Sequence, residues 1–389
     1  MSRTLFILQG GGPTAVINAT LVGIAEQATG VFDNLHGLPH SFEGNDTNET
    51  LNLNPLLEGN RAAAPLSKLL KTPGSLLGSS RKKVEEKDLE RVLIHMQSAG
   101  SDSLIGIGGD GTMKALSLLS DYAALKGQDI QVIGAPKTVD NDLPGVHVAP
   151  GYGSAARFVA MAVRDYDRDF QAMETFDDVT ILETMGRNSG WIAAASVLLK
   201  ADGVAPHIVL LPEYPVDEET LLHVIRTHHK EHGRVFIVVN EMLNALDGSL
   251  IGEDFQNGPT DSLGRKMYSL SLGTGNYLAH KIWMETGLQT RCLRPGSLGR
   301  ALSCCVSEPD RDLALRTGRA AVEALNKSSK SAQMITIDEK LNFGRQDIHT
   351  VLNSVRPLPD EYLLQDTFGV SNQFVEYAKP LIGHIDPLY

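Results

Sequence analysis

Residues 103–112 read Ser-Leu-Ile-Gly-Ile-Gly-Gly-Asp-Gly-Thr, a short apolar run that ends in a glycine-rich turn. The residues that follow, 113–124, space their apolar side chains as one face of a helix does. A strand that turns through glycines into a helix is the first half of a βαβ unit. This stretch therefore predicts an α/β fold.

The same alternation extends along most of the chain. Further apolar runs with strand character lie at residues 4–8, 131–135, 179–183, 207–211 and 235–240. Further helix candidates lie at residues 16–29, 87–99, 155–165, 191–200 and 218–232. Several of the apolar runs lack inside/outside alternation, which suits strands that are buried on both faces of a parallel sheet. We therefore expect mainly parallel sheets with short, right-handed crossovers.

Length and charge narrow the class of protein. The chain has 389 residues, of which 42% are hydrophobic and 21% are charged, as in ordinary globular proteins. Because this length exceeds one small core, we expect two domains. The net charge of -12 disfavours binding to nucleic acid or to a membrane surface, since both favour basic patches. A few local Arg, Lys and backbone N–H groups are still enough to hold a phosphate.

Neither the cysteines nor the N-terminus indicates an extracellular or membrane protein. The 3 cysteines include the adjacent pair Cys304 and Cys305, and no Cys/His spacing is typical of a zinc site. We expect all of them to be small buried residues in a reducing cytoplasm. Residues 1–12 lack a signal-peptide pattern, and no apolar stretch approaches the ~20 residues of a membrane span. We expect a cytoplasmic protein.

Glycine-rich turns follow two of the expected strands. Residues 10–13, Gly-Gly-Gly-Pro, precede a helix, and they fit either a phosphate cradle or a plain strand–helix turn. In residues 108–112, Asp110 can hold Mg²⁺ while backbone N–H groups face phosphate oxygens. The Gly-Gly-Asp-Gly-Thr pattern is shared by NAD kinases and diacylglycerol kinases. It therefore indicates a kinase more firmly than it indicates which kinase.

Two further motifs follow strands and carry charged side chains. Residues 136–142, Pro-Lys-Thr-Val-Asp-Asn-Asp, could supply the base, the metal ligand and the cation that in-line phosphoryl transfer needs, although an acidic solvated turn would look similar. Residues 183–191 place Arg187 between Gly186 and Gly190, where it could reach a phosphate. A surface arginine at a helix start is the alternative for Arg187.

In this order the motifs resemble the phosphofructokinase family, which contains ATP-dependent and pyrophosphate-dependent enzymes. The similarity runs from about residue 4 to residue 337, and residues 136–142 and 185–191 are its most specific parts. Residues 150–157, Pro-Gly-Tyr-Gly-Ser-Ala-Ala-Arg, resemble the branch with many pyrophosphate-dependent members. The resemblance implies Mg²⁺-dependent transfer of a phosphoryl group from ATP to the 1-hydroxyl of fructose 6-phosphate or a related ketose phosphate.

The resemblance also implies an architecture of two Rossmann-like three-layer α/β/α domains with the active site in the cleft between them. Residues 1–145 plus about 298–345 would bind the phosphate donor, and residues 146–297 would bind the sugar phosphate. Residues 346–389 would form a C-terminal extension, and residues 42–64 have the polar composition of a solvated insertion. Residues 327–331 have the composition of a loop.

Individual roles follow from the same resemblance. Asp140 would be the catalytic base, assisted by Thr138, Arg187 and Lys137, and Asp110 would hold the metal. The residues expected to bind the donor are Gly12, Arg81, Gly109, Asp110, Gly111 and Thr112. The residues expected to bind the acceptor are Thr138, Asp140, Asp142, Met185, Gly186, Arg187, Glu241, Arg291 and Arg300. In the family, neighbouring subunits share the grip on the acceptor phosphate, which implies a homodimer or homotetramer.

Two positions bear on the choice of donor. Gly111 stands where most pyrophosphate-dependent members carry an Asp, whose carboxylate occupies the space of the α-phosphate and repels it. Lys137 stands where many bacterial ATP-dependent members have Gly and pyrophosphate-dependent ones have Lys. Gly111 is the stronger indication of the two. Without an Asp at this position ATP can bind, whereas a flexible Lys at position 137 need not exclude ATP. We expect ATP, with pyrophosphate as the alternative.

The acceptor side departs from the family pattern. Acidic residues at 177 and 178 stand near the place of an arginine that reaches a neighbouring subunit's sugar phosphate. In residues 295–302 the family's arginine survives as Arg300, but its His and Gln do not. The acceptor could therefore be sedoheptulose 7-phosphate or another ketose phosphate. A catalytically inactive regulatory homologue, a NAD or lipid kinase and a dinucleotide-binding oxidoreductase are the alternatives from other classes.

Overall fold

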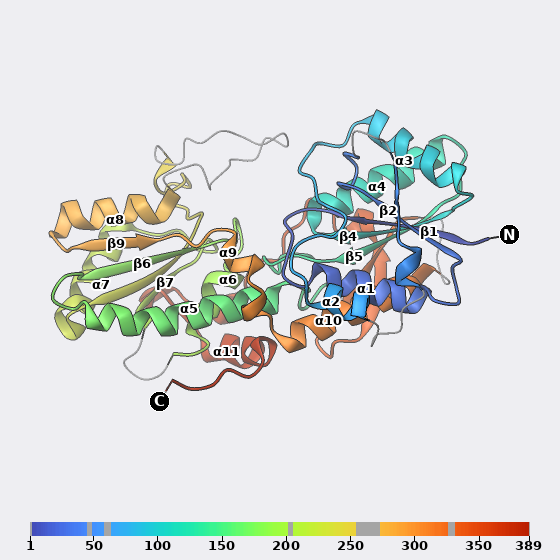
Figure 1. Cartoon of the computed structure of the whole chain (residues 1–389). Coiled ribbons are helices and arrows are strands. Elements are labelled where there is room, and N and C mark those ends of the chain that lie inside the picture. Colours follow the sequence, from blue (N-terminus) through green and yellow to red (C-terminus); the bar gives the residue numbers. More distant parts are fainter. Residues whose placement is uncertain are drawn as a thin grey trace. The chain divides into compact units, whose positions relative to one another are not determined.

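The structure is a computed structural model that describes residues 2–44, 49–57, 64–200, 205–253, 273–325 and 331–388 (Figure 1). The chain forms two compact units. Unit 1 contains Met1–Tyr152 and Arg300–Ser354, and unit 2 contains Gly153–Gly299 and Val355–Tyr389. The first boundary follows Tyr152, and not residue 145, because Gly151 is tied to unit 1. Its N–H donates to the Asp310 carboxylate at 2.8 Å, and it forms a β-bridge with Thr138.

Unit 1 is built on a seven-stranded sheet, counted over the described residues, in the order β11-β10-β5-β4-β1-β2-β3. The five inner strands run parallel to one another, and the edge strands β11 and β3 are antiparallel to their neighbours. The bounds are β1 Thr4–Gln9, β2 Asn34–Leu38, β3 Leu51–Asn52, β4 Ser103–Gly108, β5 Gln131–Pro136, β10 Gln333–Ile337 and β11 Phe343–Asp347. Every residue of β1 and β4 is buried, as runs without alternation predict.

Helices cover both faces of this sheet, with α1, α2 and α10 on one side and α3 and α4 on the other (Figure 1). The bounds are α1 Ile17–Ala28, α2 Ala64–Lys71, α3 Glu86–Ser98, α4 Asp110–Leu125 and α10 Glu308–Leu325. Two glycines let α1 and α10 pack closely. A Cβ on Gly23 would lie 2.0 Å from the carbonyl oxygen of Leu315, and one on Gly318 would lie 2.1 Å from that of Thr20.

Within its described residues, unit 2 contains a four-stranded parallel sheet in the order β7-β8-β6-β9. Its strands are β6 Val179–Thr184, β7 Ile208–Leu210, β8 Val235–Asn240 and β9 Thr290–Leu293. Its helices are α5 Tyr152–Ala172, α6 Trp191–Ala194, α7 Glu218–His232, α8 Gly273–Thr286 and α11 Asn372–Ala378, and the short helix α9 Leu298–Ala301 spans the boundary with unit 1. The prediction of α/β units with mainly parallel sheets is confirmed.

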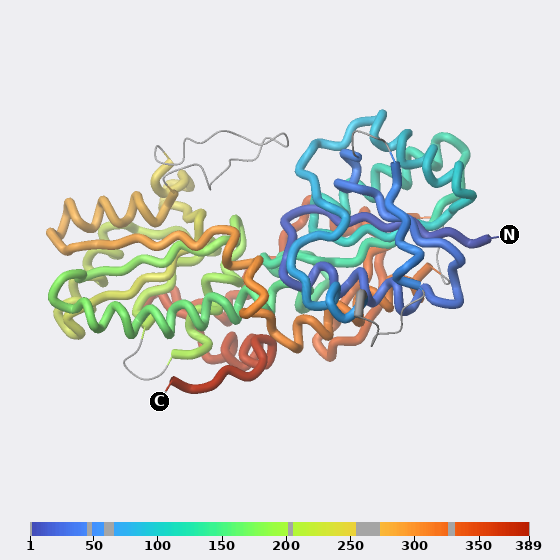
Figure 2. The backbone as a smooth tube through the Cα atoms, viewed as in Figure 1, coloured from blue at the N-terminus to red at the C-terminus, as the bar shows by residue number. Residues whose placement is uncertain are grey.

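The C-terminal segment of unit 2 runs back along α5. Figure 2 traces this segment in red beside the green α5. Arg157 of α5 donates to the carbonyl oxygens of Ile382 and His384, and Arg164 donates to that of Asp386. Farther back in this segment, the antiparallel strands β12 Leu363–Leu364 and β13 Gly369–Val370 form a short ladder.

All six expected strands and all six expected helices are present, and all but β8 and α7 have shifted bounds. The helix expected at 191–200 is shorter, because α6 ends at Ala194 and a 3₁₀ turn, Ala195–Val197, follows. The expected solvated insertion at 42–64 is partly wrong: Leu53 is 6% exposed and packs in the core, and β3 pairs with β2. Of the loop expected at 327–331, all but Ser331 lies outside the described residues.

Two smaller expectations concern the cysteines and the membrane. Burial of all the cysteines is wrong, because Cys304 is exposed and Cys292 is half-buried; only Cys305 is buried. Among the described residues, none of the helices combines the length and the apolar character needed to cross a bilayer.

Candidate active site

Three motif loops of unit 1 gather at one edge of its sheet. They follow β1, β4 and β5, which are parallel neighbours, so their carboxyl ends meet. Backbone hydrogen bonds continue past the strands: the N–H of Gly10 donates to Ile107 at 2.8 Å, and that of Lys137 donates to Gly108 at 2.9 Å. Ligands of open α/β sheets bind beyond this edge, so the three loops form one candidate site.

Glycine is required in the first two loops because they pack around one side chain. A Cβ on Gly108 would lie 2.0 Å from the Thr112 hydroxyl oxygen, and one on Gly10 would lie 2.5 Å from it. Thr112 is 6% exposed, so its side chain fills the space between the loops. Gly11 has a φ of +73°, the left-handed region that favours glycine.

The side chain of Lys137 anchors the first loop, residues 10–13, through hydrogen bonds. Its Nζ donates to the carbonyl oxygens of Gly10 at 3.0 Å and Gly12 at 2.8 Å, and the residue is 2% exposed. Burial, and next the nearby Arg300 guanidinium, lower the pKa of Lys137 to about 8. A Cβ on Gly12 would lie 2.5 Å from the Nη1 of Arg300. Gly12 therefore lies among two cationic side chains, a suitable place for an anion.

The third loop fixes its carboxylates through local hydrogen bonds. The Thr138 hydroxyl accepts from the N–H of Asp140 at 3.1 Å and lies 3.3 Å from the Asp142 carboxylate. Asn141 has a φ of +55°, and its side-chain oxygen accepts from the N–H of Ala149 at 2.8 Å. Asp140 and Asp142 are half-buried. A short, fixed turn thus presents two acids at the strand end.

Asp110 and Gly111 begin α4, directly after Gly109, the N-cap of that helix. A Cβ on Gly109 would lie 3.4 Å from the carbonyl oxygen of Lys137 and 3.7 Å from the Cβ of Thr138, so the second and third loops are in contact. Asp110 is half-buried and Gly111 is exposed. The start of α4 therefore combines a carboxylate with helix N–H groups beside the loop of Asp140.

Arg81 lies in the segment between α2 and α3 and is exposed. This segment is joined to the glycine-rich loop, because the Ser79 hydroxyl donates to the carbonyl oxygen of Gly11. The residues that the sequence assigns to the donor, Gly12, Arg81, Gly109, Asp110, Gly111 and Thr112, all lie in unit 1.

Unit 2 presents a second group of motif residues after β6 and β8. Gly186 has a φ of +141°, and a Cβ there would lie 2.5 Å from the Nδ2 of Asn240. Arg187 has a φ of +48°, and its N–H donates to the Glu241 carboxylate at 3.2 Å. Asn240 donates to the carbonyl oxygen of Ser189 at 2.9 Å. These contacts bring the loop of Met185, Gly186 and Arg187 together with Glu241.

Glu241 lies in a desolvated environment. Burial, opposed by the N–H of Arg187, raises the pKa of the Glu241 carboxyl. Its own N–H donates to the carbonyl oxygen of Thr184 at 2.9 Å. A carboxyl at a strand end with a raised pKa is a frequent feature of functional sites.

The two expected phosphate-gripping arginines lie in different units. Arg300 belongs to unit 1, beside Gly12. Arg291 belongs to unit 2, where its Nε and Nη2 lie 2.9 and 3.3 Å from the two oxygens of the Asp177 carboxylate. The side chain of Arg291 is 45% exposed. Asp177, which stands near the place of an arginine in the family pattern, is therefore the ion-pair partner of Arg291.

Sequence reasoning assigned no role to several residues of unit 2. Glu183 is 6% exposed and accepts from Arg294 at 2.7 Å and from the N–H of Gly275 at 2.8 Å. Glu213 accepts from the N–H groups of Gly190 at 2.7 Å and Leu358 at 2.9 Å. The one feature of the sequence that could have indicated Arg294 is its position between Arg291 and Arg300. Glu213 lies in no motif, so nothing in the sequence marked it.

Trp191 anchors the C-terminal segment to the same loop. Its ring is fully buried, and its Nε1 donates to the carbonyl oxygen of Arg356 at 3.2 Å. The guanidinium carbon of Arg356 lies 4.2 Å from the ring centroid of Trp191, and the rings of Tyr362 and Tyr377 pack nearby. The loop 185–191 is thus supported by residues from the end of the chain.

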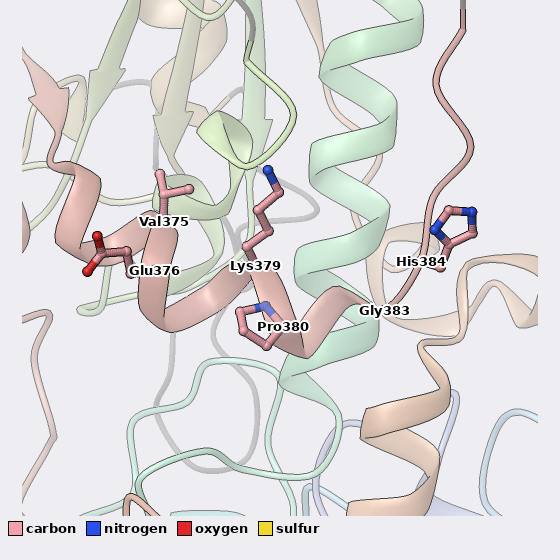
Figure 3. Close-up of a pocket in the computed structure, with 6 residues that line it drawn as sticks. All are labelled: Val375, Glu376, Lys379, Pro380, Gly383 and His384. Atoms are coloured by element: carbon pink, nitrogen blue, oxygen red, sulfur yellow. The ribbon is translucent and has the colours of Figure 1, made fainter.

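A hollow on the C-terminal segment is a separate feature (Figure 3). It is lined by Val375, Glu376, Lys379, Pro380, Gly383 and His384. No motif residue lines it. It is therefore not the candidate active site.

Comparisons with known proteins agree with these motifs. The sequence model described as Phosphofructokinase matches residues 4–325. A pyrophosphate–fructose 6-phosphate 1-phosphotransferase of Xanthomonas campestris pv. campestris is 30% identical over 398 residues, 99% of this chain and 92% of that protein. A sulfofructose kinase of Alkalicoccus urumqiensis is 32% identical over 362 residues, 91% of this chain and 90% of that protein.

The solved structures agree as well. The pyrophosphate-dependent phosphofructokinase of Nitrosospira multiformis superposes with a TM-score of 0.83 at 28% identity, covering 99% of this chain and 93% of that one. The family model covers most of the chain, and the motif loops lie at the strand ends where phosphate sites form. The chain belongs to the phosphofructokinase family.

Proposed function

We propose that the protein transfers a phosphoryl group from ATP to the 1-hydroxyl of fructose 6-phosphate or a related ketose phosphate. The observation that carries this proposal is the gathering of three motif loops at one sheet edge, with Lys137 holding the glycine-rich loop. Unit 1 would bind the donor. Unit 2 would bind the sugar phosphate. Its C-terminal extension, expected at residues 346–389, would be limited to residues 355–389, because residues 346–354 belong to unit 1.

Asp140 would act as the base that accepts the proton of the sugar's 1-hydroxyl. The hydrogen bond from its N–H to Thr138 holds the turn, so the carboxylate keeps its position while the hydroxyl attacks. Asp142 lies beside Thr138 on the same turn and would contact the acceptor. The ammonium of Lys137, which donates to the carbonyl oxygen of Gly12, would stabilise charge on the transferring phosphoryl group. Arg187 would add a further cation from unit 2.

The residues at the start of α4 fit a magnesium ion. Mg²⁺ takes oxygen ligands and usually binds through one or two carboxylates together with substrate phosphates. Asp110 supplies a half-buried carboxylate at the N-terminus of α4, where the helix dipole is positive, and this arrangement suits a metal-bound polyphosphate. When bound, the ion would neutralise charge on the donor phosphates. Asp110 would hold it, and Gly109 and Gly111 leave room for the phosphates.

In unit 2, Glu241 would bind the sugar hydroxyls, and the loop of Met185, Gly186 and Arg187 would contact the sugar phosphate. The hydrogen bond between the N–H of Arg187 and Glu241 supports a common surface for these groups. Arg291 and Arg300 would hold the acceptor's own anionic group. In the family this grip involves a neighbouring subunit, so we expect a cytoplasmic homodimer or homotetramer.

Pyrophosphate is the alternative donor. Gly111 is exposed and has no side chain to block an α-phosphate, which favours ATP. Lys137 does not discriminate, because its Nζ is engaged by the carbonyl oxygens of Gly10 and Gly12. A lysine that supports the loop is compatible with either donor.

One observation favours a second acceptor, a sulfonated ketose such as sulfofructose. Asp177 neutralises Arg291, which lowers the positive charge available to the acceptor's anionic group. A sulfonate carries a single negative charge, whereas a phosphate monoester carries roughly 1.5 to 2 at neutral pH. A weaker cationic grip suits the sulfonate better. The sulfofructose kinase among the relatives is consistent with this alternative.

The experiment that tests the proposal is a donor-by-acceptor activity matrix. ATP and pyrophosphate are each combined with fructose 6-phosphate, sedoheptulose 7-phosphate and sulfofructose in the presence of Mg²⁺. We expect turnover with ATP and at least one ketose, and its loss in Asp140→Asn. Turnover in none of the combinations, from folded protein, would contradict the proposal and favour a catalytically inactive regulatory homologue.

A further inference from the structure

A group of side chains in unit 2 has the composition of a transition-metal site. His228, Glu231 and His232 lie in the last turn of α7, and their ligand atoms all lie within 4.8 Å of one another. The two histidines are four residues apart and so lie on one face of the helix. Their ring centroids are 5.7 Å apart, and the Nε2 of His232 lies 3.8 Å from a Glu231 oxygen.

We propose that His228, Glu231 and His232 bind one Zn²⁺ ion, at a site distinct from the Mg²⁺ of phosphoryl transfer. Imidazole nitrogens with one carboxylate are ligands that Zn²⁺ accepts, and water would complete the tetrahedron. Ligand atoms about 2 Å from a common ion lie about 3 to 4 Å from one another, so small side-chain rotations would close the site. Mg²⁺ prefers an all-oxygen shell and would bind here poorly.

The position at the end of α7 supports a cation. The helix ends at Gly233, which has a φ of +73° and caps the carbonyl oxygen of His229. The C-terminal end of a helix carries partial negative charge, which favours a bound cation. Among the described residues, the buried Nδ1 of His228 also has no hydrogen-bond partner.

His207 forms the wall of the site but does not supply a ligand. Its ring centroid lies 5.2 Å from that of His232 and 5.8 Å from that of His228. Its Nδ1 accepts from the N–H of Phe236 at 2.9 Å, so the neutral ring carries its proton on Nε2. It can donate a hydrogen bond to a ligand or to metal-bound water.

Two neighbouring histidines show why the site is limited to these residues. The Nε2 of His229, on the opposite side of the turn, is paired with Asp178 at 3.1 Å. His223 lies on the same helix and is exposed, and among the residues that the structure describes it belongs to no metal-binding cluster. His223→Ala is therefore a matched control, because it removes a helix histidine without touching the site.

The test is a calorimetric titration of the metal-free full chain with Zn²⁺ in Mg²⁺-containing buffer. The exposed Cys304 can bind zinc as well, so the measurement counts equivalents in wild type and variants. We expect His228→Ala combined with His232→Ala to lose one equivalent that His223→Ala retains. We also expect the single variant His232→Gln to bind that equivalent at least ~10-fold more weakly.

The outcomes separate cleanly. The proposal is overturned if wild type binds no zinc at ~100 μM free ion, or if the double variant keeps every equivalent. Should the double variant fail to fold, His232→Gln decides, since this side chain is 41% exposed and its loss leaves the core intact. Because the readout is binding and not turnover, the result is independent of the proposed phosphotransferase activity.

Discussion

Replacing Lys137 by Met tests how the glycine-rich loop is held. The substitution keeps an unbranched apolar stem and removes the amine that donates to Gly10 and Gly12. The carbonyl groups of Gly10, which is buried, and of Gly12, which is half-buried, then lose a partner, at up to about 1–3 kcal/mol each. Against this, the fall in the pKa of Lys137 from 10.5 to about 8 means that the folded protein disfavours the charged amine by about 3 kcal/mol. The two effects largely cancel near neutral pH.

We therefore expect Lys137→Met to change the free energy of unfolding by no more than about 2 kcal/mol at pH 7, whereas kcat/KM for the donor falls at least ~100-fold. The loss of activity follows because the loop and one cation beside Gly12 are lost together. Lys126→Met, at an exposed position, is the control and should change neither quantity. Urea unfolding and steady-state kinetics give the two measurements.

The pH dependence of the same variant sharpens the test. Above pH about 8 the folded protein has released the Lys137 proton, whereas the unfolded chain keeps it up to about pH 10.5. The free energy of unfolding of wild type should therefore rise relative to Lys137→Met between these pH values. Over the same interval, kcat/KM of wild type should fall as the ammonium is lost. A stability difference that is flat with pH, or donor kinetics within ~3-fold of wild type, would refute the role of Lys137.

Four further substitutions test other parts of the structure. Asp140→Ala should lower kcat by at least ~10³-fold with an unchanged unfolding midpoint, because it removes the base and no packing; near-normal turnover would exclude Asp140 as the base. Gly111→Asp should shift preference from ATP towards pyrophosphate in a competition assay, and unchanged ATP use would contradict the steric argument. Asp177→Asn should release Arg291 from its ion pair and favour phosphate over sulfonate acceptors by ~2–5-fold in kcat/KM. Asp178→Asn is the control, and equal effects of the two substitutions on this preference would count against the ion-pair argument. Gly318→Ala should lower the free energy of unfolding by more than ~1 kcal/mol, because its Cβ would meet the backbone of α1, and thermal unfolding that matches wild type would show that the helices can separate at little cost.

The sequence predicted the part of the fold that repeats a strong local pattern. Each βα pair with an apolar run and a glycine turn was found, because buried parallel strands and tight turns leave clear marks. Strand β2, Asn-Leu-His-Gly-Leu, was missed because His36 and Gly37 interrupt its apolar character. Gly37 is there for packing: a Cβ would lie 2.6 Å from the Leu77 side chain, a contact that only the folded chain contains.

The candidate site likewise contains residues that the sequence could identify and residues that it could not. Residues on motif loops, such as Asp110 and Asp140, could be assigned because their spacing is specific. Partners that arrive from distant segments could not. Nothing in the sequence indicated that Lys137 would donate to Gly10 and Gly12, or that Asp177 would pair with Arg291 across more than a hundred residues.

The buried carboxylate of Glu213 gives the end of the chain an unexpected importance. It joins the N–H of Gly190, on the loop that carries Arg187, to the N–H of Leu358, and Trp191 is covered by aromatic rings from the same C-terminal segment. Within unit 2, a truncation before residue 355 would remove the aromatic rings that pack on the Trp191 indole. It would also remove one of the two N–H groups that donate to the Glu213 carboxylate. Trimming that looks harmless in sequence would thus loosen the arginine loop itself.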